Sequence, residues 1–201
     1  MSVASASVPP QIPPYPIWRF SVADYHRLID IGVLDENDRV ELLEGWLVPK
    51  RSHGPLHDNT VELANERIRK SLPNGWRLRV QSAITTGDSE PEPDLVLVRG
   101  EIRTAPQRHP LPTEIGLLIE VADTTLQHDR LRKTEIYGRA GILKYWIINL
   151  QDRQIECYSQ PTGPIPNANY GQCDILKPGD QLPLELDSVV VATLDPSELL
   201  P

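Results

Sequence analysis

Residues 93–99 read Pro-Asp-Leu-Val-Leu-Val-Arg, and residues 115–121 read Ile-Gly-Leu-Leu-Ile-Glu-Val. In both stretches apolar residues follow one another instead of alternating with polar ones, which is typical of strands covered on both faces. Residues 144–150, Lys-Tyr-Trp-Ile-Ile-Asn-Leu, show the same pattern. Together they predict the buried centre of a mixed sheet with at least one covered face, and hence an α/β fold class.

The segments around these strands supply helices and further strands. Apolar residues at spacings of three and four predict a helix over roughly residues 56–72, and residues 126–139 also read as helical. A short helix follows Ser21, which can cap it, and Gly32 ends that helix. Further strands are expected at residues 40–48, in two pieces around Glu44 and Gly45, and at residues 76–86, 154–159 and 188–194.

The composition predicts one folded domain with a proline-rich arm. The chain has 201 residues, of which 39% are hydrophobic, so it can bury a sizeable core. Five of the first sixteen residues are proline, and we expect an N-terminal arm over residues 1–17 and a single domain over residues 18–201. Two cysteines are too few for a disulfide scaffold. With no signal sequence and no apolar run of about 20 residues, we expect a cytoplasmic protein that does not enter membranes.

The formal charge of −8 at first argues against nucleic-acid binding, which depends on basic residues that neutralise phosphates. The charge is unevenly distributed, however. Residues 50–144 contain 15 basic and 13 acidic residues, whereas the two flanks carry a net charge of −10. The acidic total therefore leaves a phosphate substrate open, although it predicts weak general affinity for nucleic acid.

Two carboxylates stand beside buried strands, where an unpaired charge is costly. Asp94 precedes the 95–98 strand, and Glu120 lies near the end of the 115–121 strand. Carboxylates that converge from adjacent strands suit Mg²⁺ or Mn²⁺. Two plainer interpretations remain open: Asp94 can cap a turn after Pro93, and Glu120 can pair with an arginine.

Two residues of the following helix are further candidates. Lys133 and Tyr137 lie one turn apart on the same face. A lysine beside a metal-bound water can orient that water or stabilise charge on a phosphate. The alternative is a solvated helix surface, on which Lys133 would have no such role.

The order of these features resembles that of the Uma2 family in the PD-(D/E)XK nuclease superfamily. The resemblance covers about residues 40–191. Its opening is carried by Glu41-Leu42-Leu43-Glu44-Gly45 and by the His-containing helix start that follows. The remainder is carried, in order, by Pro93-Asp94, Glu120-Val121-Ala122, Lys133-Thr134-Glu135-Ile136-Tyr137, and Gly141-Ile142 followed by Tyr145-Trp146-Ile147-Ile148. It implies a restriction-endonuclease-like core of αβββαβ type, with additional short strands at both ends.

The resemblance also implies an activity, namely Mg²⁺-dependent or Mn²⁺-dependent hydrolysis of phosphodiester bonds, with DNA as the preferred substrate. Asp94 and Glu120 would hold the metal, together with the backbone carbonyl of Val121. The superfamily's in-strand lysine is replaced by Ala122, and Lys133 from the next helix matches the position that Uma2 proteins use instead. A homodimer is a further expectation from the resemblance.

Several other residues are candidates for auxiliary roles. Related nucleases often add a carboxylate from a helix before the hairpin, and Glu62 and Glu66 are suitably placed, although an exposed face is the alternative. Glu41 and Glu44 are candidates from the opening strand, and Gln81 could position water or metal. The residues expected to bind nucleic acid are basic and follow one another around the second helix, namely Arg67, Arg69 and Lys70, with Arg77 and Arg79 beyond them.

The histidines carry no clear signal of a metal or catalytic site. His53 and His57 are four residues apart, but Gly54 and Pro55 between them favour a loop over a helix. Two alternatives to the enzyme remain: a catalytically inactive nuclease fold that binds nucleic acid or protein, and an accessory protein whose acidic C-terminal part packs against a partner.

Overall fold

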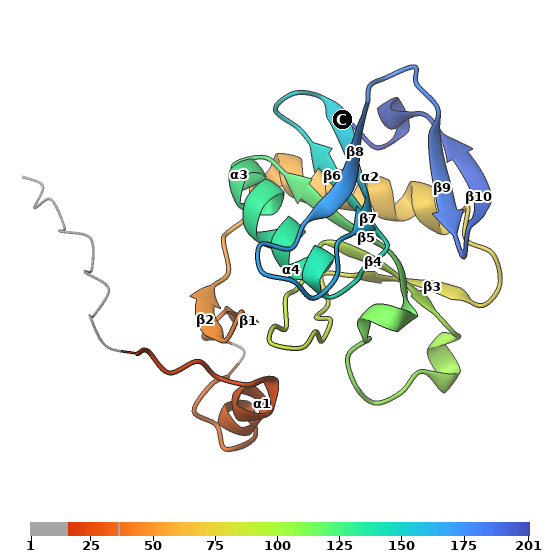
Figure 1. Cartoon of the computed structure of the whole chain (residues 1–201). Coiled ribbons are helices and arrows are strands. Elements are labelled where there is room, and N and C mark those ends of the chain that lie inside the picture. The colour runs from red at the N-terminus through yellow and green to blue at the C-terminus, as the bar shows by residue number, and fades with distance from the viewer. Residues whose placement is uncertain (1–15, 36) are drawn as a thin grey trace, which may run out of the picture.

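A six-stranded mixed sheet forms the centre of the protein in the computed structural model, which describes residues 16–35 and 37–201 (Figure 1). The predicted arm, residues 1–17, lies almost wholly outside the described residues. The strands run in the order β3 (Trp76–Val80), β4 (Leu95–Arg99), β5 (Ile115–Ala122), β6 (Lys144–Asn149), β7 (Gln154–Pro161) and β8 (Tyr170–Leu176). Only β5 and β6 are parallel neighbours. The predicted mixed sheet is confirmed.

The three strands with continuous apolar sequences are buried, as predicted. The first four residues of β4, seven of the eight in β5 and five of the six in β6 are buried. The strand predicted over residues 76–86 is shorter and ends at Val80, because Gln81 adopts a positive φ of 41° and the chain leaves the sheet there. The Gln81 N–H donates to the Asp94 carbonyl at 2.9 Å, so the loop starts beside the residue that precedes β4.

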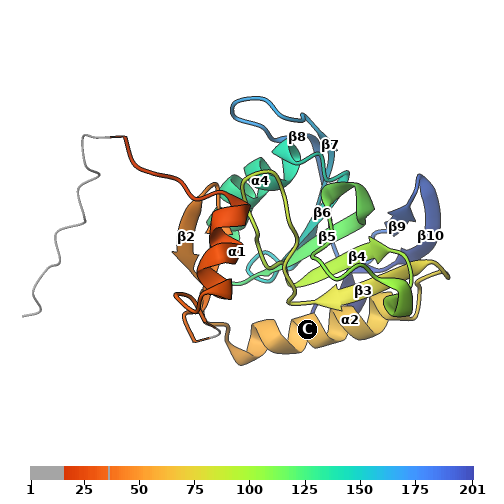
Figure 2. The same cartoon turned by 90° about the horizontal axis from the view of Figure 1, so that it is seen from below.

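Helices cover both faces of the sheet (Figure 2). On one face, α2 (Pro55–Arg69) packs its apolar side against β4 and β5, and the hairpin of β9 (Leu182–Leu186) and β10 (Val189–Leu194) completes that core. On the other face lie the helical segments between β5 and β6, whose core includes Ile136 and Tyr137. A crossover of this kind is what a parallel strand pair requires.

The helical segment predicted over residues 126–139 is present, but it is not one continuous α-helix. It consists of α3 (Leu126–His128), a π-helical segment (Asp129–Lys133) and α4 (Thr134–Arg139). A π turn holds an additional residue relative to an α turn, so it changes which face the later side chains occupy. Lys133, at the end of this segment, is buried.

The N-terminal elements form a unit beside the sheet (Figure 1). Helix α1 (Val22–Asp30) begins with the predicted cap, in which the Ser21 hydroxyl oxygen accepts from the Asp24 amide. The two strand pieces predicted over residues 40–48 are β1 (Val40–Leu43) and β2 (Trp46–Pro49), which pair as an antiparallel hairpin. Short 3-10 helices occupy Ile102–Thr104, Pro112–Glu114 and Pro196–Glu198. No helix within residues 16–35 and 37–201 is long and apolar enough to cross a membrane.

Candidate active site

A cavity of about 550 Å³ opens where the hairpin β1–β2, the start of α2 and the ends of β4 and β5 meet the π-helical segment. Asp94, Glu120, Val121 and Lys133 all line it, and so does Gln81. The structure therefore brings together the residues predicted to bind metal and the predicted lysine, although they are separated by up to 39 positions in sequence.

The sheet register explains why the two acids meet. Leu95 pairs with Ile119 in the antiparallel β4–β5 ladder, so Asp94 and Glu120 stand next to each other just beyond that pair. The Val121 N–H donates to Asp94 Oδ2 at 2.8 Å, and the Asp94 N–H donates to Glu120 Oε2 at 3.3 Å. Both side chains are buried. Asp94 thus accepts from a strand amide and does more than cap a turn.

Glu120 is held by two side chains from the crossover. The Tyr137 hydroxyl donates to Oε1 at 2.7 Å, and Lys133 Nζ lies 3.2 Å from the same oxygen. Lys133 Nζ is also 3.5 Å from Glu41 Oε2. The solvated helix surface that was the alternative for Lys133 is wrong, because this side chain is buried among carboxylates.

Burial raises the pKa of two carboxyl groups of the cavity, whereas neighbouring charges decide the pKa of Lys133. It raises the pKa of Glu120 to about 8, an effect that nearby Asp94 strengthens and the Lys133 charge partly offsets. Burial also raises the pKa of Asp129, to about 6. For Lys133, burial acts to lower the pKa, but the charges of Glu120, Glu41 and Asp129 outweigh it, so the ammonium stays protonated.

His57 is a cavity residue that the sequence analysis missed. Pro55 is the first residue of α2, a position that suits proline, so the Gly54-Pro55 pair begins the helix that carries His57 and does not place both histidines in a loop. The His57 ring is buried and its Nε2 donates to Asp94 Oδ2 at 3.1 Å. Burial lowers the pKa of His57, but the hydrogen bond to Asp94 and its charge reverse that effect and raise the pKa overall. Correct reading of the Gly-Pro pair would have revealed this residue.

Asp129 is a second missed residue. Its carboxylate lines the cavity and accepts from the Thr125 hydroxyl at 2.5 Å. In the sequence Asp129 stands between His128 and Arg130 in a charged run that looks like an exposed helix face. Its burial follows from the π turn, for which the sequence shows no signal.

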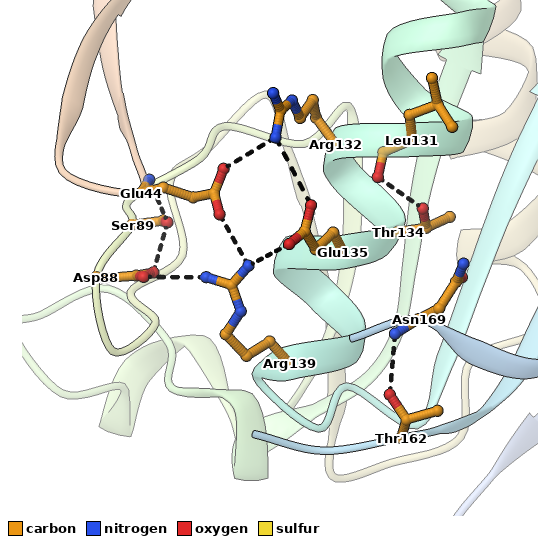
Figure 3. Close-up of polar contacts among 10 residues, drawn as sticks. All are labelled: Glu44, Asp88, Ser89, Leu131, Arg132, Thr134, Glu135, Arg139, Thr162 and Asn169. Atoms are coloured by element: carbon orange, nitrogen blue, oxygen red, sulfur yellow. Dashed lines mark hydrogen bonds and ion pairs between the residues drawn. The ribbon is translucent and has the colours of Figure 1, made fainter. Parts of the chain in front are cut away.

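The structure separates the predicted auxiliary residues into two groups. Glu41 lines the cavity and, besides contacting Lys133, accepts from the Glu92 N–H at 3.1 Å. Glu62 is exposed on α2, and neither it nor Glu44 lines the cavity. Glu44 instead joins the hairpin turn to α4, because Arg139 donates to its Oε1 at 2.8 Å (Figure 3).

The basic residues predicted to bind nucleic acid also lie apart from the cavity. They follow the second half of α2, where Arg67 pairs with Glu198, Lys70 pairs with Glu66 at 2.6 Å, and Arg69 donates to the Asn65 side chain. Besides Lys133, the lysine and arginine side chains that line the cavity come from the hairpin region, and they are Arg39, Lys50 and Arg51.

The donors in the cavity fit a hard divalent cation. Five carboxylates line it, those of Glu41, Glu92, Asp94, Glu120 and Asp129, and Glu92 is paired with Lys50 at 2.5 Å. Three of them, Asp94, Glu120 and Asp129, are buried, against the single buried ammonium of Lys133 and the buried His57 ring. Carboxylate oxygens in excess over cationic partners are the ligands that Mg²⁺ and Mn²⁺ prefer. A cation between Asp94 and Glu120 would compensate the charge that the protein leaves unbalanced.

Comparisons with known proteins identify a family and a similar fold. The model of the Uma2 family, described as "Putative restriction endonuclease", matches residues 22–194. A crystal structure from Anabaena variabilis, described as a putative nuclease belonging to DUF820, superposes with a TM-score of 0.61 at 16% identity, covering 86% of this chain and 96% of that chain. No curated protein matches the sequence. The structural likeness confirms the expected nuclease fold.

Proposed function

Because the chain belongs to the Uma2 family, we propose that it is a Mg²⁺-dependent or Mn²⁺-dependent endonuclease that hydrolyses phosphodiester bonds of DNA. Restriction-endonuclease-like proteins generally depend on a divalent metal. The observation that carries the proposal is the convergence of Asp94, Glu120 and Lys133, all three buried, in the lining of one cavity. We propose that the two carboxylates, with the Val121 carbonyl, hold the cation.

A cation held there would polarise the phosphate and lower the pKa of the attacking water. The protein's own groups perform the remaining tasks. The Lys133 ammonium, 3.2 Å from Glu120, is placed to stabilise negative charge that develops on the phosphate. Tyr137 orients Glu120 and His57 orients Asp94, since each donates to the carboxylate it contacts.

The charge of the cavity mouth supports a phosphate substrate. Arg39 and Arg51 are exposed and line the cavity, and Lys50, which also lines it, pairs with Glu92 at 2.5 Å. Basic groups at the mouth attract a polyanion toward carboxylates that would otherwise repel it. We propose that these residues contact the DNA backbone first, with Arg67, Arg69 and Lys70 extending the contact along α2.

Plasmid nicking in Mg²⁺ or Mn²⁺ tests the proposal. Wild-type protein should nick supercoiled DNA, Asp94→Asn should not, and Glu62→Gln should match wild type because Glu62 is exposed outside the cavity. Equal nicking by wild type and Asp94→Asn would contradict the proposal. We also propose that the protein is a single-domain cytoplasmic homodimer. Light scattering, which measures mass in solution, would test the homodimer.

One observation favours a second candidate, an inactive nuclease fold that binds nucleic acid or protein. Lys133 and Tyr137 both contact Oε1 of Glu120, and Ala122 stands where the superfamily has its strand lysine. In this candidate the ammonium replaces the metal. Calorimetric titration with Mn²⁺ separates the two candidates, because an enzyme of the proposed kind must bind the ion through Asp94.

A further inference from the structure

A second group of side chains that can bind a metal lies at the start of α2, where His53 and His57 line the same cavity as the carboxylates. His53 precedes the helix, and His57 and Asp58 occupy its first turn. One candidate ligand atom from each of the three residues lies within 4.8 Å of the others. His53 and Asp58 are exposed while His57 is buried, so the group opens to solvent on one side and is anchored on the other.

The two histidine rings are stacked face to face. Their centroids are 4.0 Å apart with an interplanar angle of 27°, and Nδ1 of His57 lies 3.4 Å from Asp58 Oδ1. Ligands bound to one Zn²⁺ at about 2.0–2.2 Å stand roughly 3–4 Å from one another. Because an imidazole binds a metal in its own ring plane, the exposed His53 ring must turn out of the stack to share an ion with the buried His57 ring.

The opposite edge of the His57 ring provides an independent argument. Nε2 of His57 donates to Asp94 Oδ2 at 3.1 Å, which leaves Nδ1 directed toward Asp58. A histidine that ligates a metal almost always donates its other ring N–H to a carboxylate or carbonyl, which fixes the tautomer and strengthens the ligand. His57 has this second-shell partner in place, and the partner is buried.

We propose that His53, His57 and Asp58 form a binding site for a transition-metal ion of the Zn²⁺ class, distinct from the cation site between Asp94 and Glu120. Two imidazoles and one carboxylate suit Zn²⁺, Ni²⁺ or Co²⁺, whereas Mg²⁺ prefers oxygen ligands alone. Water completes the coordination on the exposed side. The Asp58 carboxylate offsets the partial positive charge of the helix start.

The site has a structural consequence for the carboxylate site. An ion on Nδ1 of His57 restricts the ring to the orientation in which Nε2–H points at Asp94. His57 therefore connects the two sites without belonging to the coordination sphere of both. In this arrangement the ion bound by His57 would help to position Asp94 through the His57 ring.

Binding measurements on untagged, full-length protein test the site. Zn²⁺ is titrated by calorimetry in millimolar Mg²⁺, and Co²⁺ is followed by its visible absorption, for wild type, His53→Ala and Asp58→Asn. His128→Ala is the matched control, because His128 lines the same cavity without belonging to the group. We expect one Zn²⁺ per chain, with affinity lowered at least about 10- to 100-fold in both ligand variants and unchanged in the control.

Wild-type affinity in both ligand variants would overturn the proposal, and so would complete displacement of Zn²⁺ by excess Mg²⁺, which would place the ion at the carboxylates. The titrations contain no DNA. If the protein binds Zn²⁺ but does not cut DNA, the proposed site stands and the proposed nuclease activity fails. If it cuts DNA but does not bind Zn²⁺, the nuclease proposal stands and the proposed site fails.

Discussion

Glu120 and Glu156 are two buried glutamates that stand in the same row of the sheet. Glu120 pairs in register with Ile147, and Ile147 pairs in register with Glu156, so both carboxylates project from the same face. Their surroundings differ in the number of compensating donors. Arg130 donates to both Glu156 oxygens, at 2.9 and 2.5 Å, and Asn149 adds a bond at 2.7 Å.

The two ionisation states differ accordingly. Burial acts to raise the pKa of both side chains, but the bonds from Arg130, Asn149 and Tyr158 reverse it for Glu156, whose pKa falls below the ordinary value. For Glu120 the neighbouring Asp94 adds to the effect of burial, and its pKa rises to about 8. Burial of a carboxylate therefore does not mark a site by itself. A site is indicated when buried carboxylates at a cavity outnumber the buried cationic side chains that could pair with them.

Both cationic partners come from the same π-helical segment. Arg130 near its start reaches Glu156, and Lys133 at its end reaches Glu120. The fold thus uses one segment to complete a structural ion pair on one side and a candidate catalytic group on the other. Substitutions at the two glutamates should separate stability from function.

The largest expected effect is on catalysis. Glu120→Gln should lower plasmid nicking at least about 100-fold, because it removes a cation ligand, whereas losing even an outer-shell partner costs 10- to 100-fold. Glu156→Gln, assayed well below its unfolding temperature, should retain activity, because Glu156 does not line the cavity. If Glu156→Gln lost as much activity as Glu120→Gln while folded, the functional half of the comparison would fail.

The next largest effect is on stability, and here substitution of Glu156 should matter more than substitution of Glu120. Glu156→Gln should lower the free energy of unfolding by about 1–3 kcal/mol, because it breaks a pair at a buried carboxylate. The lower part of that range applies if solvent screens Arg130, whose side chain is 37% exposed. Urea unfolding measures the change. Glu185→Gln, which removes the half-exposed partner of Lys144, is the control and should lose less.

The third effect depends on pH. In chelator-treated protein, Glu120 has a pKa of about 8 when folded and about 4.5 when unfolded. A raised folded pKa contributes stability below the unfolded pKa, and that contribution is lost as pH rises through the folded pKa. The thermal midpoint of Glu120→Gln relative to wild type should therefore increase between pH 5 and 8. A constant difference across this range would mean that Glu120 is ionised throughout.

Some of the structural features behind these predictions can be recognised in the sequence, and others cannot. Residues 95–98 and 115–121 predicted the buried strands because continuous apolar runs report directly on burial. Asp94 and Glu120 were found because they interrupt or adjoin those runs. Asp129 and Glu156 could not be found in that way, since the first depends on a π turn and the second on strand pairing across Ile147.

The smallest effect concerns Glu44, a third glutamate, which extends the comparison to a partly exposed ion-pair group. Arg139 contacts Glu44, Asp88 and Glu135, and Arg132 approaches Glu44 and Glu135 (Figure 3). Because this group is only partly buried, Glu44→Gln should cost less than about 1 kcal/mol, measured by urea unfolding, and should leave nicking unchanged.

A loss of nicking in Glu44→Gln, without a loss of stability, would restore the auxiliary role that the sequence predicted for this residue. It would also show that a carboxylate can contribute to the reaction from outside the cavity. A stability loss as large as that of Glu156→Gln would instead mean that the arginine partner matters more than burial in this protein. The expected order, Glu156 above Glu44, holds only if desolvation makes the Arg130 pair the stronger one.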